Sequence, residues 1–358
     1  MVLAVENYFK DCQIPWLQER TILLCRAGSH AYGTNHALSD EDYRGIAVPP
    51  RANLLGLHDF NQYEHSGHLD MVIFGVKKAV GLLLENNPSM LEVLFCDPSD
   101  HIHVSPQGQM LLDNRHLFLS RKIRHTFGGF AYSQMRRLKL HRKRYDFGRP
   151  PIPQRKDYGL PDRTTIPKDQ LGAAQALIRK RVDSWGIDFS DLDYASRLAL
   201  QEKWADTLLE MKITDMEHTA AKSLGYSDSF LEVLAGERRY KSAMDEYTQF
   251  VEWEKNRNPE RAAMEQKFGY DLKFGTHIVR LYTTCLEALE TGHLQVKRPD
   301  ADLLRAVKAG AWTFEQLQEF SDEMIVKLDA AEKASPLPHG PSRSKVDTLL
   351  VDIVYSMI

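Results

Sequence analysis

Cysteine is scarce in this chain of 358 residues, and its spacing shows no pairing. The four cysteines are Cys12, Cys25, Cys96 and Cys285. Without a C-x-x-C pair, they suggest neither a disulfide scaffold nor a cysteine-based zinc site. No apolar run approaches the roughly 20 residues that span a bilayer, and the first residues lack a signal-peptide pattern. We therefore expect a cytoplasmic protein with no membrane segment.

A strong net charge is also missing. The chain has 46 Lys and Arg against 49 Asp and Glu, a formal net charge of -3 at pH 7. This balance neither favours nor opposes a polyanionic partner. Because 43% of the residues are hydrophobic and 27% are charged, the chain can bury a sizeable core. Its length suits one large or two ordinary domains and leaves the oligomeric state open.

Secondary-structure patterns divide the chain into an α/β part and a helical part. Residues 21–28, 42–48 and 68–74 have the short apolar runs of strands, and 76–86 then has the pattern of a helix. Pro88 opens the next helix. From about residue 116 helical patterns dominate, and we predict helices over 119–145, 168–184, 193–211, 227–256, 271–291, 300–309, 313–334 and 347–358. Residues 334–344 have the composition of a linker.

Gly28 and Ser29 follow the first predicted strand and precede a small polar turn. A glycine at such a position lets the backbone approach a ligand closely, and free amide groups there suit phosphate oxygens. Ser29 adds a hydroxyl group. An ordinary turn would have the same pattern, so this dipeptide indicates a phosphate-binding turn only in combination with the residues that follow it.

Two carboxylates, Asp40 and Asp42, follow, and ten residues separate Ser29 from Asp40. If this stretch enters a strand, both point to the same face. Neighbouring carboxylates repel each other unless a cation lies between them, and Mg²⁺ or Mn²⁺ prefers such oxygen ligands. Asp70, at the start of the third predicted strand, is placed to supply a third acid, with Glu64 as the alternative. A surface acidic turn remains the other reading of Asp40 and Asp42.

The combined motif resembles the signature of the DNA polymerase β-like nucleotidyltransferases, a Gly-Ser followed by a spaced D-x-D. It reads GSHAYGTNHALSDEDYRGI and begins at Gly28. Further features resemble a bacterial and phage branch of predicted nucleotidyltransferases associated with RNA repair. They are Tyr32 and Gly33, Asn87-Pro88 with Glu92, and the stretch 268–312.

This resemblance implies an α+β fold with a small mixed sheet. The expected domains are a catalytic core over 1–115, a helical domain over 116–335 that covers the cleft, and a linker with a C-terminal helix over 336–358. The resemblance assigns Gly28 and Ser29 to a nucleoside triphosphate. It makes Asp40, Asp42 and Asp70 the catalytic and metal-binding acids. Arg44 shares their strand face and can neutralise a phosphate or form a structural ion pair.

Two helical segments supply further candidates. Residues 121–156 hold twelve Lys or Arg and a single acid, Asp146. We predict contact with a nucleic-acid backbone or with the triphosphate for six of these basic residues: Arg136, Arg137, Lys139, Arg142, Lys143 and Arg144. In the other segment, Lys273, His277 and Arg280 fall on one helix face and are predicted to contact the nucleotide. Solvated surface and helix packing are the competing interpretations.

The function that these patterns favour is metal-dependent nucleotidyl transfer from a nucleoside triphosphate to an acceptor, with an RNA end as the leading acceptor. An acceptor hydroxyl would attack the α-phosphate and displace pyrophosphate. The alternatives are nucleotidylation of a protein or a small molecule, and a catalytically silent nucleotide- or RNA-binding module. The sequence does not determine the base or the acceptor.

Overall fold

The computed structural model describes residues 5–10, 12–37, 39–66, 69–164, 166–184 and 215–358. The helix predicted over 193–211 lies outside these residues. Two compact units are present, one formed by Met1–Lys139 with Met264–Ile358 and the other by Leu140–Ala263. The expected domain boundaries near residues 115 and 335 are not limits of these units, because the segments 116–139 and 264–335 pack with the first unit.

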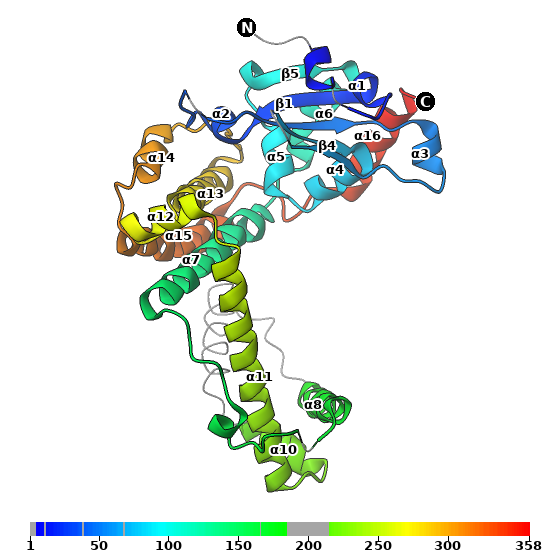
Figure 1. Cartoon of the computed structure of the whole chain (residues 1–358). Coiled ribbons are helices and arrows are strands. Elements are labelled where there is room, and N and C mark those ends of the chain that lie inside the picture. The colour runs from blue at the N-terminus through cyan, green and yellow to red at the C-terminus, as the bar shows by residue number, and fades with distance from the viewer. Residues whose placement is uncertain (1–4, 11, 38, 67–68, 165, 185–214) are drawn as a thin grey trace. The chain divides into compact units, whose positions relative to one another are not determined.

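The first unit contains a five-stranded mixed sheet (Figure 1). Its strands are β1 (Thr21–Ala27), β2 (Asp42–Ala47), β3 (Gln62–His65), β4 (Asp70–Gly75) and β5 (His101–Val104), in the order β3-β4-β2-β1-β5. The β2–β4 pair is parallel, whereas β1 pairs antiparallel with both β2 and β5, and β3 pairs antiparallel with β4. The α+β fold expected from the sequence is confirmed.

Each face of the sheet has its own apolar layer, because successive side chains of a strand point to opposite faces. On β2, Tyr43 belongs to one buried cluster, whereas Ile46 belongs to the other. The Tyr43 side packs against the N-terminal segment through Tyr8, Phe9 and Leu17. The Ile46 side packs against α4 (Val76–Leu84), α5 (Pro88–Leu94) and α6 (Pro106–Asp113), and α16 (Arg343–Tyr355) contacts α4 and α6.

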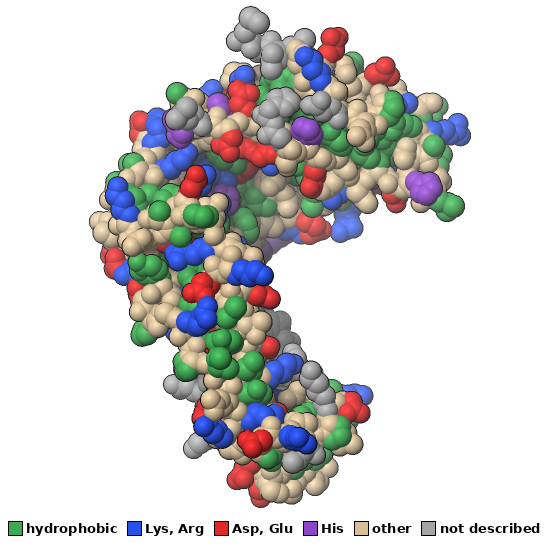
Figure 2. All heavy atoms as spheres, in the orientation of Figure 1, with side chains coloured by type: hydrophobic (Ala, Val, Ile, Leu, Met, Phe, Trp, Pro, Cys, Tyr) green, Lys and Arg blue, Asp and Glu red, His purple; other side chains and the backbone are tan. Residues whose placement is uncertain are grey.

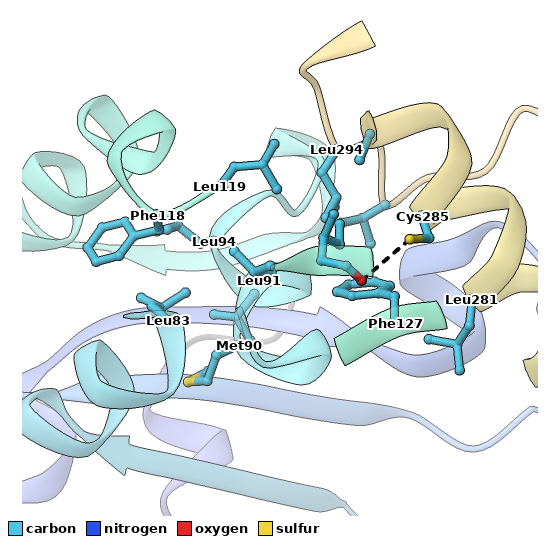
Figure 3. Packing of buried hydrophobic residues seen from close by; sticks show 14 of the residues in the cluster. Leu83, Met90, Leu91, Leu94, Phe118, Leu119, Phe127, Leu281, Cys285 and Leu294 are labelled. Atoms are coloured by element: carbon cyan, nitrogen blue, oxygen red, sulfur yellow. Dashed lines mark hydrogen bonds between the residues drawn. The ribbon is translucent and has the colours of Figure 1, made fainter. Parts of the chain in front are cut away.

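The helices after residue 115 extend the apolar cluster on the Ile46 side of the sheet. They are the π-helical turn Arg124–Gly128, α7 (Gly129–Phe147), α13 (Leu272–Thr291), α14 (Ala301–Lys308) and α15 (Phe314–Ala334). Figure 3 shows Leu83 of α4, Leu91 of α5 and Leu281 of α13 in one cluster with Phe127. The Cys285 thiol of α13 donates a hydrogen bond to the Ile123 carbonyl, 3.4 Å away.

Gly128 illustrates why this cluster needs a glycine. A Cβ atom there would lie 2.9 Å from Nη1 of Arg124 and 3.1 Å from a methyl carbon of Leu328. Arg124 is itself fully buried and pairs with Asp329 at 2.7 Å. Gly128 is therefore a close-packing point, and the π-helical turn ends there.

The second unit is helical and has a small core of its own. Its helices are α8 (Lys168–Asp183), α10 (Asp215–Ser223) and α11 (Asp228–Lys255), and α12 (Pro259–Phe268) contains the unit boundary. Leu171, Ile178, Ala220, Leu231 and Leu234 are among the buried residues that join α8, α10 and α11. Ser227 caps α11 by accepting a hydrogen bond from the amide of Phe230.

Sequence patterns located the long elements but missed short ones. The three predicted strands and the predicted helices within the described residues are present, with α16 beginning at Arg343 inside the predicted linker. The strands β3 (QYEH) and β5 (HIHV) were not predicted, since each has only four residues and mixed polarity. Their strand conformation comes from pairing with β4 and β1. No helix within the described ranges combines the length and apolar character needed to cross a membrane.

Asn86 joins the end of α4 to the segment before the π-helical turn. Its fully buried amide donates to the carbonyls of Leu83 and Phe118, at 3.1 and 2.6 Å, and accepts from the amide and hydroxyl of Ser120. It also has a φ of 51°, which asparagine tolerates better than most residues. One side chain thus satisfies four polar groups inside the protein.

We expect Asn86→Ala to lower the free energy of unfolding by about 2–4 kcal/mol, because it leaves several buried polar groups without partners. Urea denaturation would measure the change. The matched control is Asn87→Ala, which removes only the cap of α5 and should cost about 1 kcal/mol. Equal losses for the two variants would contradict this account of Asn86.

Candidate active site

The predicted site residues meet at one edge of the sheet. In the strand register, Ala27 at the end of β1 is opposite Asp42 at the start of β2, and Asp42 is opposite Asp70 at the start of β4. Gly28 follows Ala27 directly, and Asp40 precedes β2 by two residues. Because β1 runs antiparallel to β2 and β4, the end of one strand and the beginnings of the other two share this edge.

At this edge, the Gly28 backbone lies very close to the Asp42 carboxylate. Gly28 begins the short helix α2 (Gly28–Tyr32) with a φ of 60°, in the left-handed region that favours glycine. A Cβ atom on Gly28 would lie 2.2 Å from Oδ2 of Asp42. The turn is closed further on, where the amide of Thr34 donates to the Ser29 carbonyl at 2.9 Å. The Gly-Ser motif and the first carboxylate of β2 are therefore in direct proximity.

The three acids interact electrostatically through Asp42. Burial raises the pKa of Asp42 above its ordinary value, the Arg44 guanidinium acts against this shift, and the negative charges of Asp40 and Asp70 raise the pKa further. Asp40 and Asp70 are exposed, whereas Asp42 is half-buried. Glu64, the alternative third acid, is opposite Val72 rather than Asp42 in the register. Asp70 is therefore the nearer strand partner of Asp42.

A divalent cation fits the donor chemistry of this edge. Among the described side chains, no group of three or more His, Cys, Asp or Glu could hold a metal ion by itself. Mg²⁺ does not need such a cage, since one or two carboxylates with substrate phosphates and water are its usual ligands. Asp42, with Asp40 or Asp70, is thus the pair of residues that would hold the ion.

A cavity of about 110 Å³ lies beside Asp42, on the α2 side. Its lining residues come from β1, α2, β2, α5 and the segment after α13: Arg26, Ala27, Gly28, Ala31, Tyr32, Asp42, Arg44, Ser89, Glu92, Val93 and Val296. Arg44, predicted to serve either a phosphate or an ion pair, lines the cavity and donates from Nη1 to the Tyr43 carbonyl at 2.9 Å. The cavity therefore combines carboxylates, guanidinium groups and the hydroxyls of Tyr32 and Ser89.

Glu92 is the principal residue of the cavity whose chemical role the sequence did not reveal. The Tyr32 hydroxyl donates to its Oε2 at 2.7 Å, and Nη1 of Arg280 pairs with its Oε1. The guanidinium of Arg280 also stacks on the Tyr32 ring, 3.8 Å from the ring centre. A signal was present, because Glu92 is a single acid inside the apolar helix PSMLEVL.

The three residues of α13 that were predicted to contact the nucleotide differ in their burial and in their partners. Arg280 is buried, and its Nη2 lies 3.1 Å from Nδ1 of His277. Burial, with the nearby Arg280 charge, lowers the pKa of His277 to about 3, so this imidazole is neutral at physiological pH. Lys273 is exposed in the first turn of the helix. Arg280 thus reaches the cavity through Glu92 and Tyr32, which line it.

The segment between α13 and α14 holds α2 from the other side. The amide of Arg298 donates to the Tyr32 carbonyl at 3.1 Å, and the Arg305 side chain donates to the Gly33 carbonyl. Arg298 is buried between Glu287 and Asp300, at 2.8 and 2.9 Å. Chain segments as far as 272 residues apart in sequence therefore determine where the Gly28-Ser29 turn lies.

The six basic residues predicted to form a polyanion surface do not belong to one unit. Arg136, Arg137 and Lys139 are in the first unit, and Arg142, Lys143 and Arg144 are in the second. Several have partners within their own unit. Arg137 stacks on Phe274, Arg142 pairs with Asp146, and Arg144 stacks on Trp253. Acidic and basic side chains are interspersed on the face drawn in Figure 2.

We expect Gly28→Ala to destabilise the protein and weaken the site. A non-glycine residue in the left-handed region costs about 1–2 kcal/mol, and the new Cβ must displace the Asp42 carboxylate. Thermal unfolding and Mg²⁺ titration would measure the two effects. In the control Gly81→Ala, the new Cβ meets no atom within 4 Å on α4, and stability should rise by up to about 1 kcal/mol. Unchanged stability and Mg²⁺ binding in Gly28→Ala would argue against the close approach.

We expect Asp42→Asn to stabilise the metal-free protein at pH 7, by about 1 kcal/mol or less because solvent screens a half-buried group. The raised pKa means that ionised Asp42 is less favourable in the folded than in the unfolded state. This penalty is present above the folded-state pKa and disappears as the pH falls below the ordinary value of 3.8. Thermal unfolding between pH 3 and pH 8 would measure it.

The control for Asp42→Asn is Asp352→Asn, on an exposed position of α16, which should change stability little. Added Mg²⁺ should raise the unfolding temperature of the wild type but not that of Asp42→Asn. An Asp42→Asn variant less stable than the wild type at pH 7 would show that the carboxylate is stabilised rather than strained.

Comparison with known proteins gives a family and one distant relative. Residues 6–156 match the family described as RlaP, the RNA repair pathway DNA polymerase beta family. The chain is also 22% identical over 333 residues to the "Uncharacterized 38.9 kDa protein in nrdC-mobD intergenic region" of Enterobacteria phage T4, covering 87% of this chain and 89% of the phage protein. No solved structure matches the chain.

The matched range contains the whole sheet, the Gly28-Ser29 turn and the three acids. It also includes α5 with Glu92, whereas α13 and its Arg280 lie beyond it. The resemblance found in the sequence is therefore confirmed for the part of the chain that carries the candidate site. Residues 6–156, which carry the sheet and the candidate site, are thus similar to the RNA repair pathway DNA polymerase β family, and the polymerase β-like family generally consists of nucleotidyltransferases.

Proposed function

We propose that this protein transfers a nucleoside monophosphate from a nucleoside triphosphate to a hydroxyl group at an RNA end. The observation that carries the proposal is the meeting of Gly28, Asp42 and Asp70 at one sheet edge beside a polar cavity. Such an edge combines backbone amides for phosphate oxygens with carboxylates for divalent cations. Neither the backbone amides nor the carboxylates by themselves distinguish nucleotidyl transfer from nucleotide binding.

The reaction forms a bond between the acceptor oxygen and the α-phosphorus and breaks the bond from the α-phosphorus to pyrophosphate. The amide groups of the Gly28-Ser29 turn would hold triphosphate oxygens, with Arg44 as a further cationic contact. Asp70 is exposed and next to Asp42, and it would take the proton of the attacking hydroxyl. Divalent cations held by the acids would neutralise the phosphates and lower the pKa of that hydroxyl.

RNA is the proposed acceptor because the family is described by its place in RNA repair. The exposed Arg136 and Lys143 offer sequence-independent contacts to a phosphate backbone. A protein or small-molecule acceptor would use the same site for the triphosphate but would not need these contacts. Dependence of acceptor binding on salt therefore separates the two cases, since phosphate contacts release counterions.

The experiment that tests the proposal is transfer of label from each α-labelled nucleoside triphosphate into a pool of small RNAs with Mg²⁺. We expect labelled RNA with the wild type, and at least about a thousandfold less with Asp40→Asn or Asp42→Asn. Losing a charged metal ligand removes several kcal/mol of transition-state stabilisation, and each 1.4 kcal/mol is a factor of ten.

Two controls make the outcome decisive. Circular dichroism should show that both variants fold, and Asp352→Asn should transfer label like the wild type. Activity in a folded Asp42→Asn variant would remove this carboxylate from the mechanism. Absence of label with every triphosphate would refute RNA as the acceptor. The same assay with protein or small-molecule acceptors would then distinguish another transferase from a binding protein.

A further inference from the structure

Glu92 presents a carboxylate to the cavity that is held in place from two sides. Arg280 pairs with one oxygen, and the Tyr32 hydroxyl binds the other at 2.7 Å. The side chains of Glu92 and Arg280 are only 13% and 6% exposed. The stacking of Arg280 on the Tyr32 ring joins the two anchors to each other. The carboxylate thus has a defined position and a compensated charge.

This carboxylate retains capacity to accept further hydrogen bonds. An ionised carboxylate has about four acceptor positions, and Arg280 and Tyr32 use one each. Since Glu92 lines the cavity, a free position is available to a ligand there. The ligand group must be a hydrogen-bond donor, because a phosphate oxygen would be repelled. A sugar hydroxyl meets this requirement.

The position of the cavity indicates which substrate would occupy it. The sheet order β4-β2-β1 places Asp70 on one side of Asp42 and the Gly28 turn on the other. The cavity is on the Gly28 side, and among the described residues none of its lining comes from β4. The triphosphate is assigned to the Gly28 side and the acceptor to the Asp70 side. The group next to the α-phosphate of a triphosphate is its ribose.

We propose that Glu92 accepts a hydrogen bond from a ribose hydroxyl of the bound nucleoside triphosphate and makes the site selective for ribonucleotides. This inference rests on the proposed function for its substrate class. Tyr32 and Arg280 are positioning residues that act through Glu92. Arg280 therefore contributes to nucleotide recognition without touching a phosphate, in contrast to the direct contact expected from the sequence.

The test compares binding of ribonucleoside triphosphates with that of their 2′-deoxy and 3′-deoxy analogues, by calorimetry with Mg²⁺. For the wild type, loss of one hydroxyl should weaken binding about tenfold or more, the usual effect of losing a hydrogen bond to a charged group. In Glu92→Met/Arg280→Met, which removes both members of the buried ion pair, the preference should fall below about threefold. Tyr32→Phe removes one anchor and should give an intermediate preference.

The matched control is Arg155→Met/Glu237→Met, which removes another largely buried Arg–Glu pair, at 2.5 Å in the second unit and outside the cavity lining. It should lose stability but keep the preference of the wild type. Thermal unfolding would establish that each variant is folded. Because the wild-type comparison needs no variant, a failure of the double variants to fold does not prevent the test.

Equal binding of ribo and deoxy triphosphates by the wild type would overturn the inference. So would an undiminished preference in the folded Glu92→Met/Arg280→Met variant or in Tyr32→Phe. Selective binding of ribonucleotides without any transfer of label would refute the proposed reaction and support the role of Glu92. Transfer of label without a preference for ribonucleotides would support the proposed reaction and refute the role of Glu92.

Discussion

The close approach between the Gly28 backbone and the Asp42 carboxylate is the constraint on which the site depends. It requires a left-handed residue without a side chain directly after β1, and it requires β2 to begin opposite the end of β1. The parallel pairing of β4 then brings Asp70 beside Asp42. The turn proposed to bind phosphate and the carboxylates proposed to bind a cation are adjacent because one register places the ends of three strands at the same edge.

The same arrangement has an electrostatic cost in the metal-free protein. Asp42 is half-buried, and it lies close enough to Asp40 and Asp70 for their charges to raise its pKa. Arg44 of β2 and His30 of α2 lower the pKa of Asp42 and so act against this shift. A cluster of this kind is less stable than neutral side chains of similar size would be, which is the usual sign of residues retained for binding. A divalent cation with substrate would reverse the balance.

Segments distant in sequence hold the residues around this edge in place. Arg280 of α13 fixes Glu92 of α5, while Arg298 and Arg305 hold the backbone of Tyr32 and Gly33. The helices after residue 264 belong to the same compact unit as the sheet, and the second unit is an insertion between them.

Sequence alone determined the elements whose pattern is local. The spacing of Gly28, Asp40 and Asp42 indicated the resemblance to the family. Apolar periodicity located the long helices and the three central strands. Both signals depend on residues near each other in the chain. Tertiary structure decided the rest. The short strands β3 and β5 exist through pairing, and the anchoring of Glu92 depends on a partner 188 residues away. Such contacts leave no periodic signal, since each is made by single side chains that only folding brings together.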